Sequence, residues 1–364
     1  MPSGSGQIEN LRIAAGQLNA ALSNRVRDLG SIDKGIILSG VMDYDRCAVI
    51  MFTKDNADRL RITLPQFSDK PVRTILLDDS TTDDTQRLFA SRFGQTNIEY
   101  HGRTQQDAVL AQMEQRLGEF ITPLGTPHWH LGDCRNYAIW LALSRNLERV
   151  ILIDDDILLS DSAQVLATLN LLSQFPLIGA KTIGMPDDSV VGHVLRGLGA
   201  VEHDFISGQY LGLALDRISF HFPDVYDEDW IFLLLHSLEL PLARYGTVTQ
   251  LYYDPFGDME AECLFQEPGE ILVEGLIDAI VMYRRPSLLF EEVFWRKIVF
   301  SRKSRITEIE GLLRERPDGR ELLHHHGKLA IYHEEVDPRT FAKWWGGYFE
   351  ANKIWRQILA SRCE

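Results

Sequence analysis

Cysteine is scarce in this chain. Only four occur in 364 residues, and no two of them form a C-x-x-C pair. Most structural zinc sites and disulfide frameworks need cysteines at close, regular spacings. The sequence therefore predicts neither kind of site, and a reducing cytoplasm is the expected location. The four cysteines are Cys47, Cys134, Cys263 and Cys363.

Long apolar runs and excess positive charge are missing as well. No run reaches the roughly 18 to 20 apolar residues that a membrane span requires, and the stretch MPSGSGQIEN lacks the basic-then-apolar order of a signal peptide. The formal net charge is −15. A nucleic-acid or anionic-membrane partner needs a concentrated basic face, so neither is expected. An anionic substrate would need a metal or a local group of cationic side chains.

Residues 1–45 are expected to form a leader followed by an amphipathic helix. Apolar residues recur there at three- and four-residue steps, which places them on one face of a helix. That face can pack on its own domain or against a second copy in a homodimer. The apolar positions are Ile8, Leu11, Ala15, Leu18, Leu22, Val26 and Leu29.

Residues 46–265 alternate short apolar runs with amphipathic stretches. Strands that are apolar on both faces and separated by helices predict an α/β fold with a mainly parallel sheet covered by helices. Ligands of such sheets gather beyond the carboxyl ends of the strands. Residues 266–364 are expected to form a separate helical region. The predicted strands are 47–53, 72–79, 96–101 and 149–156, and the helices between them are 85–93, 105–120 and 134–146.

The stretch RVILIDDDILLSD (149–161) leads an apolar strand directly into three carboxylates. Three adjacent carboxylates repel one another, and burying them is unfavourable unless a cation or solvent compensates their charge. At the end of a strand, alternate side chains share a direction, so Asp154 and Asp156 can face one way and Asp155 the other. An isolated triplet would be read as a solvated turn.

Other polar segments accompany this triplet in a definite order. The first strand leads into a turn with Asn56, and the second ends in DDSTTDDT (78–85); an Arg135-Asn136 pair precedes the triplet, and Glu228-Asp229 follows it. As an ordered set, these segments resemble the GT-A fold glycosyltransferases, particularly the family 2 type. The resemblance covers roughly residues 46–245 and implies a Rossmann-like GT-A fold that binds a nucleoside-diphosphate sugar together with Mn²⁺ or Mg²⁺.

The resemblance also implies roles for single residues. Asp154 and Asp156 would correspond to the DXD motif of that family. Asp154 would contact the ribose or sugar and would bind the metal together with Asp156. For Asp78 and Asp79, the alternative is that they only stabilise the turn and cap the following helix. For Arg135, the alternative is a structural ion pair with the carboxylates. Nucleotide-binding roles fall to Thr53, Asp78, Asp79, Arg135, Asp154, Asp155 and the segment Ser207, Gly208 and Gln209.

The Glu228-Asp229 pair precedes the apolar helix WIFLLLHSLEL. A carboxylate at a helix N-terminus is favoured in its ionised form, and an ionised carboxylate can accept the proton of an acceptor hydroxyl. By resemblance Asp229 is the expected general base and Glu228 its substitute, with helix capping as the alternative. Gly208 is expected to leave room for the donor sugar because it has no side chain.

Two further features are expected to be structural. The triplet His324 to His326 is read as a solvent-facing turn, with metal or diphosphate contact as the alternative. The aromatic residues between 341 and 355 recur at near-helical spacing, which is typical of a core stripe, although an acceptor platform or a dimer contact would use the same residues. They are Phe341, Trp344, Trp345, Tyr348 and Trp355.

The sequence thus predicts a metal-dependent transferase that moves one sugar to a soluble or peripheral acceptor with inversion. The chain lacks the Q-x-x-R-W motif and the membrane helices of the family's processive polymerases, which favours a single transfer. A retaining glycosyltransferase, a nucleotidyltransferase and a non-catalytic sugar-nucleotide binding protein are the alternatives. The sequence identifies neither the sugar, the base nor the acceptor.

Overall fold

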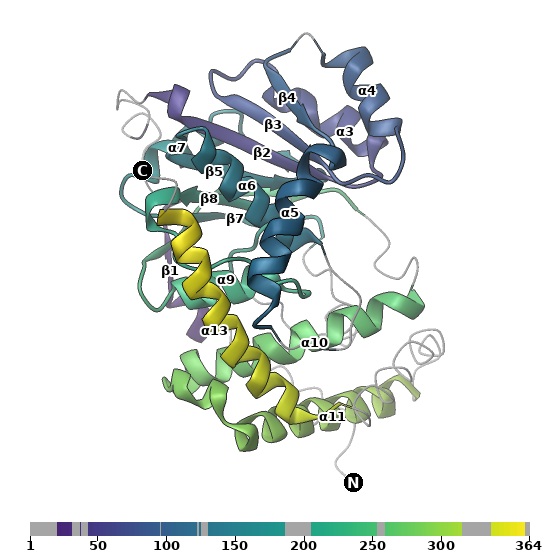
Figure 1. The fold of residues 1–364 in the computed structure, drawn as a ribbon, viewed down its shortest axis with the longest axis vertical. Coiled ribbons are helices and arrows are strands. Elements are labelled where there is room, and N and C mark those ends of the chain that lie inside the picture. The colour runs from purple at the N-terminus through teal and green to yellow at the C-terminus, as the bar shows by residue number, and fades with distance from the viewer. Residues whose placement is uncertain are drawn as a thin grey trace.

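The computed structural model describes residues 20–30, 37, 43–94, 96–121, 124, 130–185, 205–252, 259–314 and 336–360. The centre of the molecule is one nine-stranded sheet with the order β1-β9-β7-β8-β5-β2-β3-β4, and β6 pairs with β9 (Figure 1). The strands are β1 (Val26–Asp28), β2 (Cys47–Thr53), β3 (Arg73–Asp78), β4 (Ile98–His101), β5 (Arg149–Asp154), β6 (Ile157–Leu159), β7 (Leu177–Ile183), β8 (Tyr210–Ala214) and β9 (Leu242–Gln250).

Most neighbouring strands are parallel. The exceptions in the described part of the sheet are β8, which is antiparallel to β5 and β7, and β6, which is antiparallel to β9. The expected α/β fold with a mainly parallel sheet is confirmed. The flanking helices are α3 (Ala57–Thr63), α4 (Asp84–Arg92), α5 (Arg103–Gly118), α6 (Leu131–Ser144), α7 (Gln164–Leu171) and α9 (Glu228–His236).

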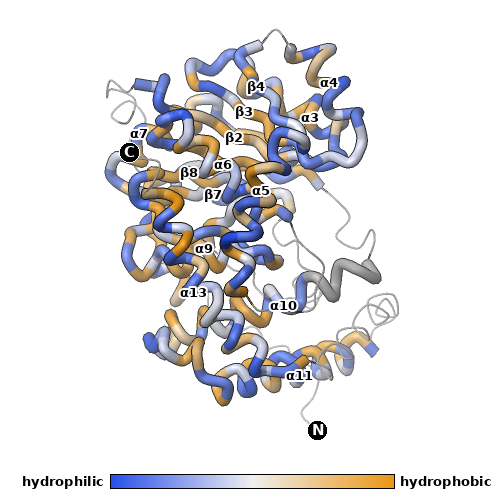
Figure 2. Tube along the Cα trace, viewed as in Figure 1, coloured by the Kyte–Doolittle hydropathy of each residue, from blue (hydrophilic) through white to orange (hydrophobic). Residues whose placement is uncertain are grey.

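Alternate residues of the strands enter two different hydrophobic clusters. Val49 and Met51 of β2 pack with α3, α4 and α7, whereas Ala48 and Ile50 pack with α5 and α6 on the other face. The central strands are therefore mostly orange in Figure 2, while the flanking helices alternate between apolar and polar residues. This two-sided burial explains why the sequence shows continuous apolar runs and no alternation.

In the described residues 259–314 and 336–360, the chain is mainly helical, as expected. It contains α10 (Met259–Ile277), which continues into a π-helical turn (Asp278–Met282), then α11 (Glu292–Arg314) and α13 (Pro338–Ala360). No helix in the described ranges is long and apolar enough to cross a membrane. The predicted domain boundary at residue 266 remains a prediction. Helix α13 packs against elements on both sides of this boundary.

Helix α13 lies along α5 and α9 and reaches α11 (Figure 1). Its aromatic residues 341–348 belong to a cluster with α10 and α11, whereas Trp355 and Ile358 belong to the cluster on the sheet. A side chain at Gly347 would come within 1.8 Å of the Phe120 carbonyl oxygen, so the two backbones touch there. All five residues of the stripe are at most 2% exposed, which agrees with the prediction that they form core.

The predicted N-terminal helix does not extend to Leu29. Residues 20–23 are helical, but Val26–Asp28 forms β1, which pairs in parallel with residues 242–244 of β9. An ion pair between Asp28 and Arg244 at 3.0 Å accompanies this pairing. Because the chain turns between them, Leu22 and Leu29 are buried in different clusters and do not form one stripe. The positions before residue 20 and the histidine triplet lie outside the described residues.

Two buried histidines fasten the segment between β8 and α9. His236 Nδ1 donates to the Phe232 carbonyl, and its Nε2 accepts from the Ser219 amide at 3.0 Å. His221 Nδ1 donates to Asn352 Oδ1 of α13 at 2.9 Å. Burial lowers the pKa of each histidine to about 4, although the hydrogen bond that each Nδ1 donates opposes the shift.

Both imidazoles are therefore expected to remain neutral down to about pH 5. The unfolded chain takes up these protons below about pH 6.5, whereas the folded chain does so only near pH 4. The two groups thus lower the free energy of unfolding as the pH falls through this window. Histidine ¹⁵N NMR should show His236 as the Nδ1-H tautomer at pH 6, and a titration midpoint near 6.5 at either residue would contradict the prediction.

Candidate functional site

The register of the sheet brings the acidic strand ends to one edge. Phe52 pairs with Asp154 on β5, and Thr53 pairs with Asp78 on β3. Because these three strands are parallel neighbours, the residues that follow them emerge side by side. The carboxylates predicted at these strand ends are far apart in the sequence, but they lie together at one edge of the sheet.

The three carboxylates of the triplet have different partners. Asp154 accepts from Arg135 of α6 at 3.3 Å, Asp155 accepts from the Thr53 hydroxyl at 2.6 Å, and Asp156 accepts from the Gln250 amide at 3.0 Å. The strand ends at Asp154, and the next two residues form a turn into β6. The alternation expected at the end of a strand therefore does not apply to Asp155 and Asp156, which lie in this turn.

Burial of this turn makes the negative charges unfavourable. Burial raises the pKa of Asp154 to about 6, although Arg135 opposes the shift. The pKa of Asp155 rises to about 7 because burial outweighs its hydrogen bond from Thr53, and the pKa of Asp156 is also raised by burial. A bound cation would relieve this penalty for the ionised forms.

Arg135 is a fixed internal cation. Its guanidinium is 2% exposed and donates to Glu228 at 2.5 Å as well as to Asp154. Burial alone would lower the pKa of Arg135, but the charges of Glu228, Asp154 and Asp229 outweigh burial and raise the pKa above its ordinary value. Of the two expected roles of Arg135, the structure shows pairing with carboxylates. Its partner Glu228 is buried, which raises the Glu228 pKa to about 8 even though Arg135 opposes the shift.

Asp229 is the more accessible member of the acidic pair. It is part-buried in the first turn of α9, where its Oδ2 accepts from the Gly208 amide at 2.5 Å and its Oδ1 from the Trp230 amide at 2.8 Å. Asp229 is not the N-cap residue, which is Asp227, but its contact with the Trp230 amide satisfies one N–H group of the first turn of α9, as the capping alternative expects. These contacts favour Asp229 over Glu228 as the residue that meets an acceptor, because the carboxylate of Glu228 is used by Arg135.

Gly208 is required for a reason that differs from the expected one. A Cβ atom at this position would lie 2.4 Å from the Arg135 guanidinium. The missing side chain makes room for the arginine, and the expectation that it also makes room for the donor sugar stays a prediction. The neighbouring Ser207 donates to Gln209 Oε1 at 3.1 Å.

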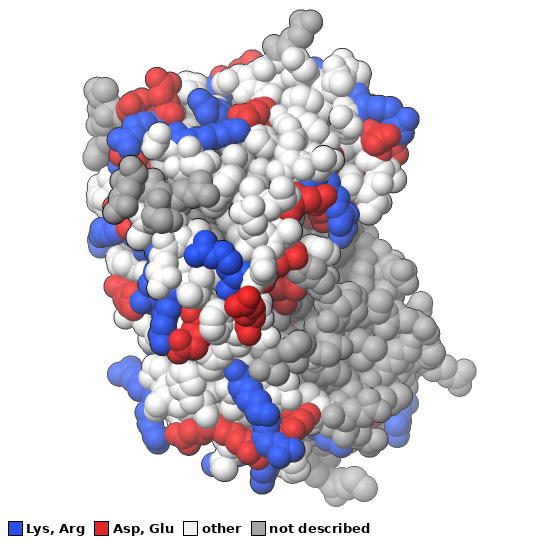
Figure 3. Space-filling model, in the orientation of Figure 1, with Lys and Arg blue, Asp and Glu red and all other residues white. Residues whose placement is uncertain are grey.

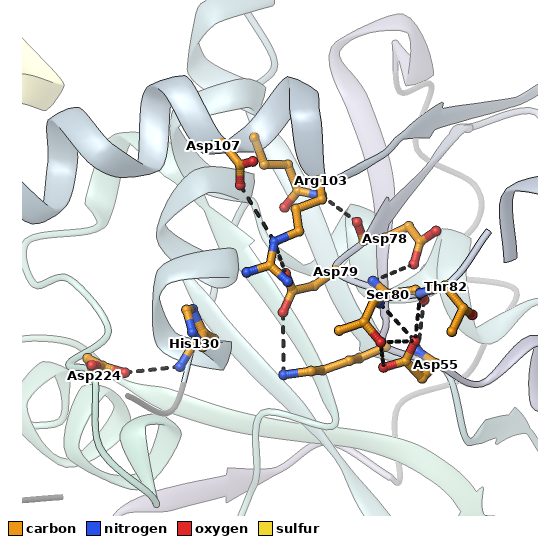
Figure 4. A network of polar contacts seen from close by, with 12 residues as sticks. Asp55, Asp78, Asp79, Ser80, Thr82, Arg103, Asp107, His130 and Asp224 are labelled. Carbon is orange, nitrogen blue, oxygen red and sulfur yellow. Dashed lines mark hydrogen bonds and ion pairs between the residues drawn. The ribbon is translucent and has the colours of Figure 1, made fainter. Parts of the chain in front are cut away.

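The two carboxylates at the end of β3 have separate roles (Figure 4). Asp78 is 3% exposed and accepts from the Tyr100 hydroxyl at 2.7 Å and the Ser80 amide at 2.9 Å. Asp78 therefore stabilises the turn that follows β3. Asp79 lies 3.6 Å from Lys54 and 3.7 Å from Arg103. Asp79 is the residue of this pair that faces cationic, solvent-accessible surroundings suited to a nucleotide.

Several residues at this edge escaped the sequence analysis. Lys54 and Arg59 follow β2, Arg103 begins α5, and Gln250 ends β9. Arg59 lies 3.7 Å from Asp156. The alternation of charges in KDNADRLR after the first strand was a usable signal for the first two. Gln250 gives no such signal. A single glutamine at a strand end is unremarkable in the sequence, and its contact with Asp156 joins two distant segments.

Asp154 and Asp156 suit a cation whose other ligands are substrate phosphate and water. Within the described ranges, no three His, Cys, Asp or Glu side chains are gathered as a complete metal site. Mg²⁺ and Mn²⁺ are commonly held by one or two carboxylates, with substrate phosphate and water completing the shell. Asp154 is part-exposed, and the buried Oδ1 of Asp156 has no hydrogen-bond partner. These two residues therefore fit such an ion.

The surface agrees with an acidic chain that has only local basic groups. On the face shown in Figure 3, Lys and Arg side chains are interspersed with Asp and Glu. Among the described residues, a pocket between α3 and α4 lies beside the turn after β2 and is lined by Asn56, Arg61 and Arg87 with seven other residues.

No sequence family and no curated protein sequence match the chain. Among solved structures, it is similar to the mannosyltransferase PcManGT from Pyrobaculum calidifontis in complex with GDP-Man and Mn²⁺, with 13% identity over 95% of this chain and 98% of that one and a TM-score of 0.41. It is also similar to a nucleotide-diphospho-sugar transferase, described as putative, from Desulfovibrio desulfuricans G20, with 13% identity over 57% and 82% of the two chains and a TM-score of 0.34.

A third similar structure is the galactosyltransferase LgtC in complex with donor and acceptor sugar analogs. The identity is 16% over 54% of this chain and 72% of that one, with a TM-score of 0.31. Each similarity concerns the fold. The function is therefore argued from the contacts of the site itself.

Proposed function

We propose that this chain is a metal-dependent glycosyltransferase that uses a nucleoside-diphosphate sugar. The observation that carries the proposal is the convergence, on one sheet edge, of the acidic triplet, the internal cation Arg135 and the part-exposed Asp229. Asp154 and Asp156 would hold Mn²⁺ or Mg²⁺, which supplies a Lewis acid for the charge developing on the diphosphate. Asp79, with Lys54 and Arg103, would contact the nucleoside.

The proposed reaction is a single inverting displacement. The acceptor oxygen forms a bond to the anomeric carbon while the bond from that carbon to the diphosphate oxygen breaks, and the diphosphate leaves with the electron pair. Asp229 takes the acceptor proton. Arg135 orients Asp154 through its hydrogen bond and keeps Glu228 paired. The backbone amide of Gly208 holds Asp229 in the position from which it would act.

Calorimetry tests the binding half of this proposal. Titration of UDP and GDP, each with and without Mn²⁺, should show binding that depends on the metal for one of them. Binding without metal dependence, or no binding of either, would contradict it. With a turned-over donor, anomer-resolved NMR separates inversion from retention. Release of pyrophosphate instead of a nucleoside diphosphate would indicate a nucleotidyltransferase, and metal-dependent binding without turnover a sugar-nucleotide binding protein.

Asp229→Asn is expected to lower the rate of donor hydrolysis by roughly 10²-fold or more, the usual contribution of a general base. Nucleotide binding should be preserved, because an asparagine oxygen can still accept from the Gly208 amide. Release of the nucleoside diphosphate from the donor, with water as acceptor, is the measurement.

Asp227→Asn is the matched control for this variant. Asp227 precedes the same helix in a left-handed conformation with φ of 61°, which asparagine tolerates well. Its rate should stay close to that of the unaltered chain. Equal rates for Asp229→Asn and the unaltered chain would remove Asp229 from the role of base.

A further inference from the structure

Gln250 makes a buried contact that the proposed reaction does not yet use. It is the last residue of β9 and is 5% exposed. Its Nε2 donates to Asp156 Oδ2 at 3.0 Å, and its Oε1 accepts from Gln209 Nε2 at 2.9 Å. The next backbone amide, that of Leu251, donates to the Asp156 carbonyl at 2.8 Å. Residue 156 is thus held by β9 through both its main chain and its side chain.

These contacts form a chain of hydrogen bonds with a single direction. The Ser207 hydroxyl donates to Gln209, the Gln209 amide donates to Gln250, and the Gln250 amide donates to Asp156. Reversing either amide would oppose two acceptors or two donors, because each glutamine offers one of each kind. A directed chain of this kind polarises in one sense and ends on a negative carboxylate, which is its favourable terminus.

The chain engages one oxygen of Asp156 and leaves the other without a hydrogen bond. Oδ2 accepts from Gln250 and lies 3.7 Å from Arg59, whereas Oδ1 is buried and has no hydrogen-bond partner. A buried carboxylate oxygen without a partner is unfavourable unless a ligand completes it. Fixing Oδ2 therefore fixes the direction in which Oδ1 is presented.

We propose that Gln250 is a positioning residue for the cation. It holds Asp156 so that Oδ1 is the oxygen that meets the ion. Through Gln209 it also links this carboxylate to Ser207, the neighbour of Gly208, whose amide holds Asp229. The metal carboxylate and the proposed base would thus share one hydrogen-bonded support. This inference rests on the proposed function, because it assigns Asp156 to the metal.

Gln250→Met tests the inference, since methionine keeps the length of the side chain and removes the donor. The affinity for Mn²⁺ in the presence of the nucleoside diphosphate that binds, UDP or GDP, would be measured by the electron paramagnetic resonance signal of free Mn²⁺. Loss of a partner that orients a metal ligand typically weakens metal binding about 10- to 100-fold, and this is the expected result. Gln209→Met, which cuts the chain one step further away, should give a smaller loss.

Gln66→Met is the matched control. Gln66 is also a glutamine that contacts the segment after the triplet, because its Nε2 donates to the Ile157 carbonyl of β6 at 3.0 Å and its Oε1 accepts from the Leu159 amide at 2.7 Å. It does not bond to the Asp156 carboxylate in the described contacts. It should lower the melting temperature and leave the Mn²⁺ affinity within about twofold, since no metal ligand loses a partner.

The outcomes separate the inference from the proposed function. Undiminished Mn²⁺ affinity in Gln250→Met, or an equal loss in Gln66→Met, overturns the positioning role and leaves the proposed function intact. If the unaltered chain binds no Mn²⁺ with either nucleotide, both are overturned. If Gln250→Met does not fold, the comparison of Gln209→Met with Gln66→Met decides, and equal affinities in those two variants overturn the inference.

Discussion

Asp156→Asn is expected to abolish metal-assisted nucleotide binding and to lower turnover by roughly 10³-fold or more, because a metal supplies several kcal/mol of charge stabilisation in such reactions. Asparagine has the shape of aspartate but lacks the charge that would bind the cation. Calorimetry with the nucleoside diphosphate and Mn²⁺, together with donor hydrolysis, gives both measurements.

The same substitution is expected to leave the melting temperature unchanged or to raise it. Burial raises the pKa of Asp156, so its negative charge is unfavourable in the folded chain, and a neutral amide removes that penalty. Glu350→Gln is the control, because it removes an exposed carboxylate that pairs with Lys353 on α13. Metal-dependent binding that survives in Asp156→Asn would show that the triplet does not hold the ion.

Arg302→Met is expected to lower the free energy of unfolding by about 3–5 kcal/mol, the usual effect of breaking a buried ion pair from one side. Arg302 is 2% exposed on α11, and its guanidinium donates to both oxygens of Glu267 at 2.8 Å. It also donates to Glu274 at 2.7 Å and Glu270 at 3.3 Å. The variant leaves Glu267 buried with two fewer hydrogen bonds.

Urea unfolding followed by tryptophan fluorescence measures this loss, because Trp295 lies on the same helix. Arg296→Met is the control on α11. Its guanidinium is 67% exposed and pairs with Glu292 one turn away, so about 0.5 kcal/mol or less should be lost. The double variant Arg302→Met with Glu267→Met should recover part of the stability. A loss below about 1 kcal/mol in the single variant would show that the network is not a stabilising one.

The parts of the fold that were predictable are those with a strong local signal. A strand is predicted at residues 47–53, and β2 is observed at Cys47–Thr53. This strand was predictable because its seven consecutive residues are all buried and form a continuous apolar run. The helix that contains the Arg135-Asn136 pair was also predicted. The three-residue strand β1 was not, because Val26–Asp28 pairs with β9 more than two hundred residues later.

The candidate site divides in the same way. The strand-end carboxylates could be named from the sequence because an apolar run that ends in acid is a local pattern. Their partners could not, since each lies in a distant segment: Gln250 is 94 positions from Asp156, and Glu228 is 93 positions from Arg135. The burial of Asp78 under Tyr100 was hidden for the same reason.

The placement of α13 limits how this molecule can move. Its first half is embedded among α10 and α11 and its second half among the helices on the sheet, so rotating α10 and α11 against the sheet would unpack two hydrophobic clusters at once. Opening and closing of these helices as a jaw around a substrate is therefore disfavoured. The helices after β9 and the sheet are therefore expected to behave as one rigid frame.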